Sequence, residues 1–261
     1  MGLCTDKSTS YLKGLGYNVV RHPNAALKPL DLIGVQGDSN YLGPLNLLVA
    51  QSPGPLPAAQ TDVPAADING QTSSKLDFSI GLSILGNIIS ALGGNNLGLN
   101  ASYTDAQKVE FSYTGVLNDQ VVPLEVGNYL KNGTVDTGNK ILAQYVLGNG
   151  DLYLITKTAK SKKFTVSYER SNGTAAKVDV PVIQNAVGGN IKVSVDSARK
   201  HVVTYEGGSN LAFGFQCFQV GVADGSLNLT SVSAGSVVAA VGASAQAPAL
   251  ISRHGLLEMR Y

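Results

Sequence analysis

The stretch DLYLITKTAKSKKFTVSYE, residues Asp151–Glu169, contains two runs in which apolar and polar side chains alternate. A period of two is typical of a β-strand that buries one face and exposes the other. The runs are residues 151–157 and 163–169, and the connection between them is rich in lysine: Lys157, Lys160, Lys162 and Lys163. The sequence therefore predicts two strands joined by a basic hairpin tip.

Strand-like runs recur along the rest of the chain, and one segment has the period of a helix. The strand-like runs are Tyr17–Pro23 (ended by the proline), Leu27–Gly34, Lys108–Tyr113, Lys177–Val180 after an Asn172-Gly173 turn, Ile191–Val195, His201–Tyr205 and Leu211–Cys217. Between Phe78 and Leu92, large apolar residues recur at steps of three and four, which predicts a helix. Together these patterns predict an α+β domain with a twisted, largely antiparallel central sheet and surrounding helices.

Two segments are candidates for parts that change conformation. Ser52–Ala66 holds four of the ten prolines and predicts a surface loop or a strand connection. The lysine hairpin predicts contact with anionic lipid, at about 1 kcal/mol per lysine near a charged surface. The alternative for the lysines is a solvated turn that protects a sheet edge from aggregation.

The composition excludes several classes of protein. Of the 261 residues, 14% are charged and 44% are hydrophobic, and the net charge is +1. A nucleic-acid binder needs a strong basic excess, and a disordered chain has low hydrophobicity, so neither class is expected. No run approaches the ~20 apolar residues of a membrane-spanning helix, so crossing a bilayer would require a closed β-barrel.

The residues that build enzyme and metal sites are sparse. The three histidines, His22, His201 and His254, stand in unrelated contexts without the paired spacing of metal ligands. The chain also has no nucleophile elbow and no phosphate loop. The prediction is that the protein is not an enzyme, binds no metal and needs no cofactor.

The two cysteines have different predicted roles. Cys4 follows Met1-Gly2-Leu3 with no signal peptide, which predicts a cytoplasmic protein with a thiol that an acyl chain could modify. Cys217 stands in an apolar context and is expected to be a small buried hydrophobic residue. Two cysteines do not form a disulfide framework.

The last part of the chain differs from the rest. Residues 1–235 are expected to form the main domain, and residues 236–261 a linker followed by a short peptide. Ser233–Ala249 is rich in Ala, Ser, Gly and Val, as a pliable linker is. The peptide then returns to large apolar residues: Leu250, Ile251, Leu256, Leu257 and Met259. Such a peptide is either the last element of the fold or a removable latch.

Cys4, the block Gly16–Pro23, the following Pro29-Leu30 and the short apolar tail together resemble the bacterial gasdermins. The resemblance covers essentially the whole chain and is most specific in the first 35 residues. It implies a fold like the pore-forming N-terminal domain of gasdermins. It also implies that Cys4 is S-palmitoylated in the resting form, with the lipid in an apolar cavity.

The resemblance further implies a function. The resting protein would be a cytoplasmic monomer, and a caspase-like protease encoded nearby would remove its C-terminal autoinhibitory peptide. The freed body would oligomerise in the inner membrane as a large β-barrel and kill the cell, as an antiviral defence. The scissile bond does not transfer between family members, so the expected cleavage region is broad: Ala239, Ala243, Ala245, Ala247, Leu250 and Arg253.

A second function class stays open on the sequence. An acylated binding module that docks on membranes without forming pores would also use Cys4. Only a pore-former requires a cleavable tail whose loss converts a monomer into a membrane oligomer. A plain β-rich adhesion domain explains neither feature.

Overall fold

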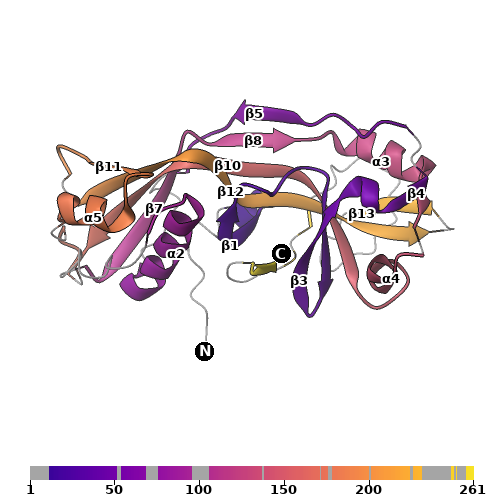
Figure 1. The fold of residues 1–261 in the computed structure, drawn as a ribbon, viewed down its shortest axis with the longest axis horizontal. Helices are drawn as coiled ribbons and strands as arrows, with labels where there is room; N and C mark the ends of the chain where they lie inside the picture. The colour runs from indigo at the N-terminus through magenta and orange to yellow at the C-terminus, as the bar shows by residue number, and fades with distance from the viewer. Residues whose placement is uncertain are drawn as a thin grey trace.

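Two long antiparallel strands form the centre of the protein (Figure 1). The computed structural model describes residues 12–51, 54–68, 76–95, 106–136, 138–170, 172–175, 178–199, 201–223, 226–230, 248–249, 251 and 257–261. The long strands are β10 (Asp151–Glu169) and β12 (Val202–Ala223). They pair from Leu152↔Val220 at one end to Ser167↔Val202 at the other. All further strands of this sheet are arranged around the pair.

The expected lysine hairpin is wrong, because residues 151–169 form one continuous strand. Neighbouring strands supply ladder partners on both sides of the lysine region. Lys157, for example, lies opposite Gln120 on one side and Gln216 on the other. Backbone pairing on both edges, with local bulges, therefore carries the strand through a segment whose charges suggested a turn.

The remaining strands extend the sheet in both directions, and nearly all pairings are antiparallel. Three strands share the second edge of β10: β2 (Asp31–Gln36), β8 (Leu117–Gln120) and β7 (Lys108–Thr114). β12 also pairs with β1 (Asn18–Asn24), β11 (Lys192–Val195) and β13 (Ser226–Thr230). The outer strands of this sheet are β3 (Asp38–Pro44), β5 (Gln60–Pro64), β6 (Leu76–Asp77) and β14 (Met259–Arg260). A separate two-stranded sheet consists of β4 (Val49–Gln51) and β9 (Thr134–Val135). The expected antiparallel α+β fold is confirmed.

The strand limits differ from the sequence expectation at two prolines. β1 continues through Pro23, because the pairing with β12 is irregular between Val19 and Asn24. A strand at such an irregularity needs no hydrogen bond from the proline nitrogen. β5 lies inside the proline-rich segment, which was expected to be a surface loop or a strand connection, and it is an exposed edge strand. Edge positions are where a strand tolerates proline.

The helices cover the faces of the sheet. They are α2 (Phe78–Ala91), α3 (Pro123–Asn132), α4 (Lys140–Val146) and α5 (Val180–Val187), with a 3-10 turn η1 (Leu45–Leu47). The helix predicted at Phe78–Leu92 is confirmed by α2. The strand predicted at Lys177–Val180 is wrong, because α5 begins there. The Asp179 carboxylate accepts a hydrogen bond from the backbone N–H of Val182 at 3.2 Å, which caps the helix.

One end of the sheet has its own apolar cluster and is here called the distal sheet. It consists of β7, residues 163–169 of β10, residues 202–206 of β12, and β11, and it lies against α2 and α5 (Figure 1). The buried cluster on its inner face is Leu85, Ile88, Ile89, Ala106, Val109, Phe111, Phe164, Val166, Tyr168, Ile183, Val187, Ile191, Val203, Tyr205 and Leu211. No helix of the described segments is both long enough and apolar enough to span a bilayer.

Candidate functional site

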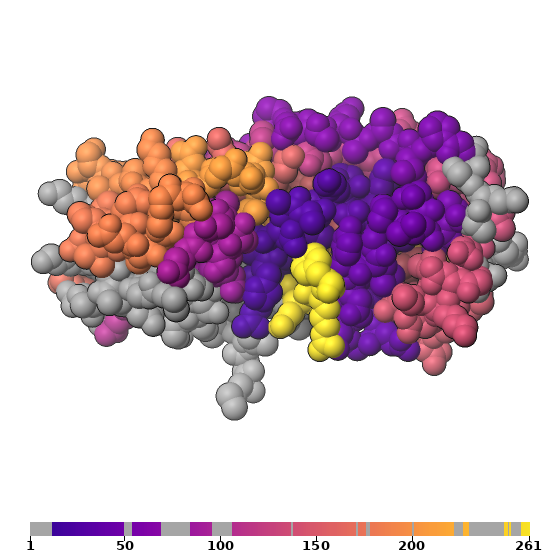
Figure 2. Space-filling model, in the orientation of Figure 1, coloured from indigo at the N-terminus to yellow at the C-terminus, as the bar shows by residue number. Residues whose placement is uncertain are grey.

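The C-terminal residues lie across the middle of the molecule, between strands from its beginning (Figure 2). Leu257 forms a parallel bridge with Val20 of β1. Its N–H donates to the carbonyl oxygen of Val19 at 2.8 Å, and its own carbonyl oxygen accepts from the N–H of Arg21 at 2.8 Å. The tail thus pairs with the outer edge of β1 as a further strand would.

Two residues further on, the same segment pairs with a different strand. In β14, Met259 lies opposite Ser39 and Arg260 opposite Asn40 of β3, in parallel register. The path β1-β12-β10-β2-β3-β14 is therefore closed by the bridge from Leu257 back to β1. The tail joins two sheet edges, and these make no other strand pairing in the described part of the chain.

The interior of this ring of strands is apolar. Every strand of the ring contributes a side chain to one cluster: Val20, Ile33, Tyr41, Tyr153, Ile155, Ala212, Phe215, Cys217, Leu257 and Met259. Leu257 is 6% exposed and Met259 is 7% exposed. Burying a side chain of this size contributes roughly 1.5–3 kcal/mol before entropy is subtracted. The tail is thus part of the core of the ring.

A buried asparagine holds the upstream part of the tail. Asn18 of β1 donates from Nδ2 to the carbonyl oxygen of Ala249 at 2.9 Å, and its Oδ1 accepts from the N–H of Ile251 at 2.7 Å. The N–H of Ala249 donates to the carbonyl oxygen of Cys217 at 2.7 Å. Asn18 is 1% exposed, so both tail groups depend on its side chain for these bonds.

Two ion pairs flank the apolar contacts. Arg21 lies 3.1 Å from Glu258, and Arg260 lies 2.8 Å from Asp38. All four side chains are at least 47% exposed, and ion pairs of this kind contribute about 0.2–1 kcal/mol each. Their main effect is on register, because a one-residue shift of the tail would separate both pairs.

Cys217 lies directly beneath the tail. It is fully buried, and this burial raises the pKa of its thiol well above the ordinary value, more than the Asn18 hydrogen bond lowers it. Its Sγ is 3.5 Å from the carbonyl oxygen of Ala249. The expectation of a small buried hydrophobic residue is therefore confirmed.

The four lysines are dispersed along β10, and three of them contact other side chains. The Lys160 ammonium lies 2.7 Å from Asp119 and 3.0 Å from Asp62, and its side chain is only 17% exposed. Burial alone would lower the pKa of Lys160, but hydrogen bonds to the two carboxylates outweigh it and raise the pKa. Lys157 stands over the Tyr17 ring, Lys162 pairs with Glu206, and Lys163 is exposed. A clustered basic tip is absent from this strand.

Several predicted site residues lie outside the described residues. These are Cys4, Ala239, Ala243, Ala245, Ala247, Leu250, Arg253 and Leu256. Ile251, Leu257 and Met259 are described, and they contact the body of the protein as set out above.

The sequence analysis did not identify Asn18 as a site residue, although it stands in the block on which the family resemblance rests. Among the described residues, no group of three or more His, Cys, Asp or Glu residues could hold a metal ion.

The fold is that of a gasdermin. A solved structure described as a bacterial gasdermin from Bradyrhizobium tropiciagri superposes with a TM-score of 0.65, covering 97% of this chain and 96% of that chain, at 14% identity. Similarity at this level of identity establishes the fold alone.

Sequence comparison gives the family. A model of the Bacterial Gasdermin Family matches residues 20–226. The protein called Gasdermin bGSDM from Vitiosangium sp. is 45% identical over 264 residues, which cover 99% of each chain. A second protein of that name, from a Desulfuromonadales bacterium, is 40% identical over 83% of this chain and 82% of its own. The chain belongs to the bacterial gasdermin family, and it is a pore-forming gasdermin in a family that is not enzymatic.

The thiol of Cys217 should report whether the tail is in place. In a Cys4→Ser variant, we expect a maleimide to leave Cys217 unlabelled at pH 7–8 while the tail is docked, because burial and a raised pKa keep the thiol neutral and covered. Removal of the tail should make the thiol react. Mass spectrometry measures the labelling, and an added cysteine at exposed Ser194 serves as the accessible control. Equal labelling of Cys217 with and without the tail would contradict the geometry.

Proposed function

We propose that this chain is an autoinhibited pore-former that its C-terminal segment holds in a resting, monomeric, cytoplasmic state. A protease, caspase-like and encoded nearby, cuts in the region that contains Ala239, Ala243, Ala245, Ala247, Leu250 and Arg253. The body then oligomerises and inserts into the bacterial inner membrane as a large β-barrel. The resulting cell death is a defence against phage infection.

The observation that carries the proposal is the position of the tail between β1 and β3. Unpaired strand edges are templates for pairing with another chain. In the resting form, Leu257 occupies the edge of β1 and Met259–Arg260 occupies the edge of β3. Loss of the tail leaves both edges free and opens the apolar interior of the ring. Free strand edges and exposed apolar side chains favour association of the body with other copies and with lipid.

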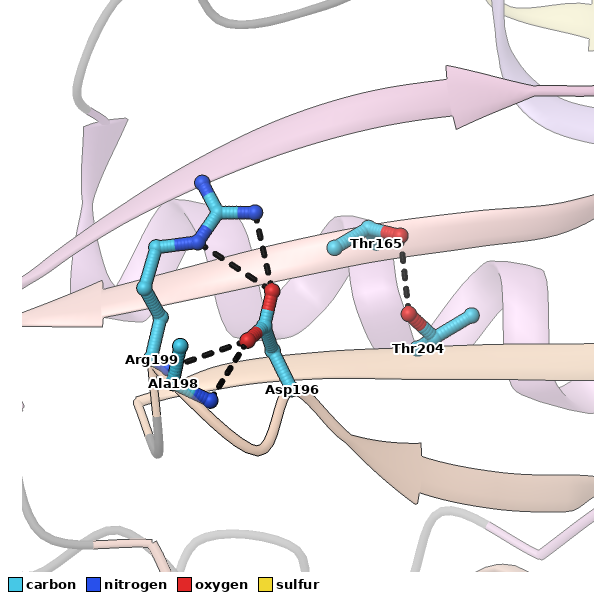
Figure 3. Close-up of polar contacts among 5 residues, drawn as sticks. All are labelled: Thr165, Asp196, Ala198, Arg199 and Thr204. Carbon is cyan, nitrogen blue, oxygen red and sulfur yellow. Dashed lines mark hydrogen bonds and ion pairs between the residues drawn. The ribbon is translucent and has the colours of Figure 1, made fainter.

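The distal sheet has the two-faced character that a barrel wall requires. Its inner face is apolar and is covered by α2 and α5. Its other face carries polar side chains such as Thr165 and Thr204, whose hydroxyl oxygens are 3.0 Å apart (Figure 3). The β11–β12 turn at its end is held by Asp196, which accepts hydrogen bonds from the Ala198 N–H and from Arg199. A transmembrane strand presents one face to lipid and one to water. We infer that the distal sheet supplies wall strands.

Cleavage acts through effective concentration. While the tail is joined to the body, the tether keeps it near its position between β1 and β3 at an effective concentration of roughly millimolar order. After a cut, rebinding becomes bimolecular and the same contacts hold a peptide that can diffuse away. Inhibition therefore needs no large second domain, because residues 249, 251 and 257–260 already contact β1, β3 and β12.

We propose that Cys4 carries a palmitoyl thioester in the resting protein, which adds a membrane-seeking group to the body. Intact-mass spectrometry of protein made in bacteria should then give a palmitoyl mass increment that hydroxylamine removes. The Cys4→Ser variant should lack the increment. A native mass without it in the wild-type protein would remove the lipid from the account and leave the tail mechanism standing.

The tail proposal is tested by dye release from anionic liposomes, with a protease site introduced near Ala245. Release is expected only after cutting. Alanine at both Leu257 and Met259 should make the uncut protein release dye, because each truncation of a buried side chain costs about 2 kcal/mol or more of docking energy. At that cost, the equilibrium constant for tail undocking rises at least about 30-fold per residue.

The matched control is Leu124→Ala, which truncates a leucine that is 73% exposed on α3. It should behave as wild type before and after cutting. If the cut protein binds liposomes but releases no dye, the protein is instead a membrane-docking module. If uncut and cut proteins release dye equally, the tail does not restrain the body.

A further inference from the structure

The strand pairing of the central sheet is interrupted along a line that crosses β12, β10 and the connection between β7 and β8. Ser161 of β10 pairs with Leu211 of β12, but the next pair along is Lys163 with Glu206. One residue of β10 therefore faces a longer insert in β12, residues 207–210, whose sequence is Gly-Gly-Ser-Asn. Bulges of this kind bend a strand and locally release it from the ladder.

The interruption continues on the other side of β10. There, Lys160 pairs with Leu117 at the start of β8, and Lys163 pairs with Thr114 at the end of β7. Gly115 and Val116 lie between these strands, and Gly115 has a φ of 60° that favours glycine. The three interrupted segments, 115–116, 161–162 and 207–210, are here called the transverse break.

Side chains replace the missing ladder bonds at the transverse break. The Asp67 carboxylate accepts the N–H of Gly115 at 2.7 Å and that of Val116 at 3.4 Å. The Ser161 hydroxyl oxygen accepts the N–H of Lys163 at 2.9 Å and lies 2.7 Å from the carbonyl oxygen of Thr114. Ser161 is 7% exposed. These backbone groups therefore have side-chain partners in place of a continuous ladder, so the break has its own supporting bonds.

The buried residues on the two sides of the transverse break fall mainly into different apolar clusters, with contact across the break where Leu211 joins the distal cluster and the rings of Tyr113 and Phe213 stack at 4.0 Å. Beyond it lies the distal sheet with its own apolar cluster under α2 and α5. On the near side lie the ring of strands and the docked tail. A Cβ at Gly207 would come 2.4 Å from Cδ2 of Leu92 at the end of α2, whereas Gly208 has open space around it. The insert thus combines one packed glycine with one unconstrained glycine.

We propose that the transverse break is a hinge, and that the distal sheet turns about it as a unit when the pore forms. Asp67 and Ser161 are its positioning residues, because their side-chain hydrogen bonds fix the resting angle between the two sides of the break. The link between this motion and pore formation rests on the proposed function. The cooperative separation of the two sides is a property of the soluble protein and is testable without pores.

The first test is hydrogen exchange on the uncut protein. Residues 108–114, 163–169 and 202–206 should exchange as one cooperative group, distinct from residues 151–160 and 211–220. Ser161→Ala should speed exchange of the Lys163 amide by about fivefold, as loss of one hydrogen bond implies. A continuous gradient of protection across 161–163, with no boundary, would overturn the hinge.

The second test is the dye-release rate of the cut protein. Ser161→Ala and Asp67→Asn should raise the rate by about fivefold, because each removes hydrogen bonds that hold the resting angle. Gly208→Ala should lower it by about threefold, because it stiffens the insert without a clash. Gly221→Ala, on the same strand and also in open space, is the control and should leave the rate unchanged.

The outcomes separate the hinge from the proposed function. Pores with rates in all three variants equal to that of Gly221→Ala would overturn the hinge, whatever the exchange data show. If cut wild-type protein forms no pores, the proposed function fails. The exchange boundary alone then decides whether the two sides open independently. Ser161→Ala is backed by Asp67→Asn, so a folding failure of one variant leaves the test intact.

Discussion

The resting structure depends on one backbone interaction, the pairing of Leu257 with β1 while Met259 and Arg260 pair with β3. This pairing closes the strands around a single apolar cluster. Without it, the edges of β1 and β3 have no strand partner in the described part of the chain, and Cys217 loses its cover. A segment of a few residues can restrain the rest of the protein in this way, because it pairs with the edges of β1 and β3 at the same time.

Different contacts within the tail make different contributions. The apolar side chains Leu257 and Met259 supply most of the docking energy, since each exposed ion pair adds only about 0.2–1 kcal/mol. Asn18 fixes the upstream end by bonding to backbone groups at Ala249 and Ile251, so it is indifferent to the side chains there. The tail is therefore held at two places, and the expected cleavage positions Ala239, Ala243, Ala245 and Ala247 precede both of them in the chain. A cut at one of these four positions leaves both sets of contacts on the released peptide and removes only the tether.

Elements with a strong periodic signal could be predicted from the sequence, and α2 and the distal strands are examples. The apolar tail residues Leu257 and Met259 were recognisable because large apolar side chains return after a linker of small residues. The continuity of β10 was not predictable, because the partners that hold its lysine segment in register come from distant β8 and β12. Asn18 and Ser161 likewise become important only through tertiary hydrogen bonds, and nothing local distinguishes either from an ordinary polar residue. At Val180, the Asp179 cap outweighed a weak strand pattern.

The central claim is that tail departure, rather than cleavage itself, activates the protein. A disulfide between cysteines at Asn40 and Arg260, which are register partners on β3 and β14, would staple the tail to the body. With the engineered linker cut and the staple oxidised, the account predicts no dye release from anionic liposomes, and release on adding reductant. The Asn40→Cys single variant should release dye after cutting in either condition. Equal release with the staple closed and open would contradict the account.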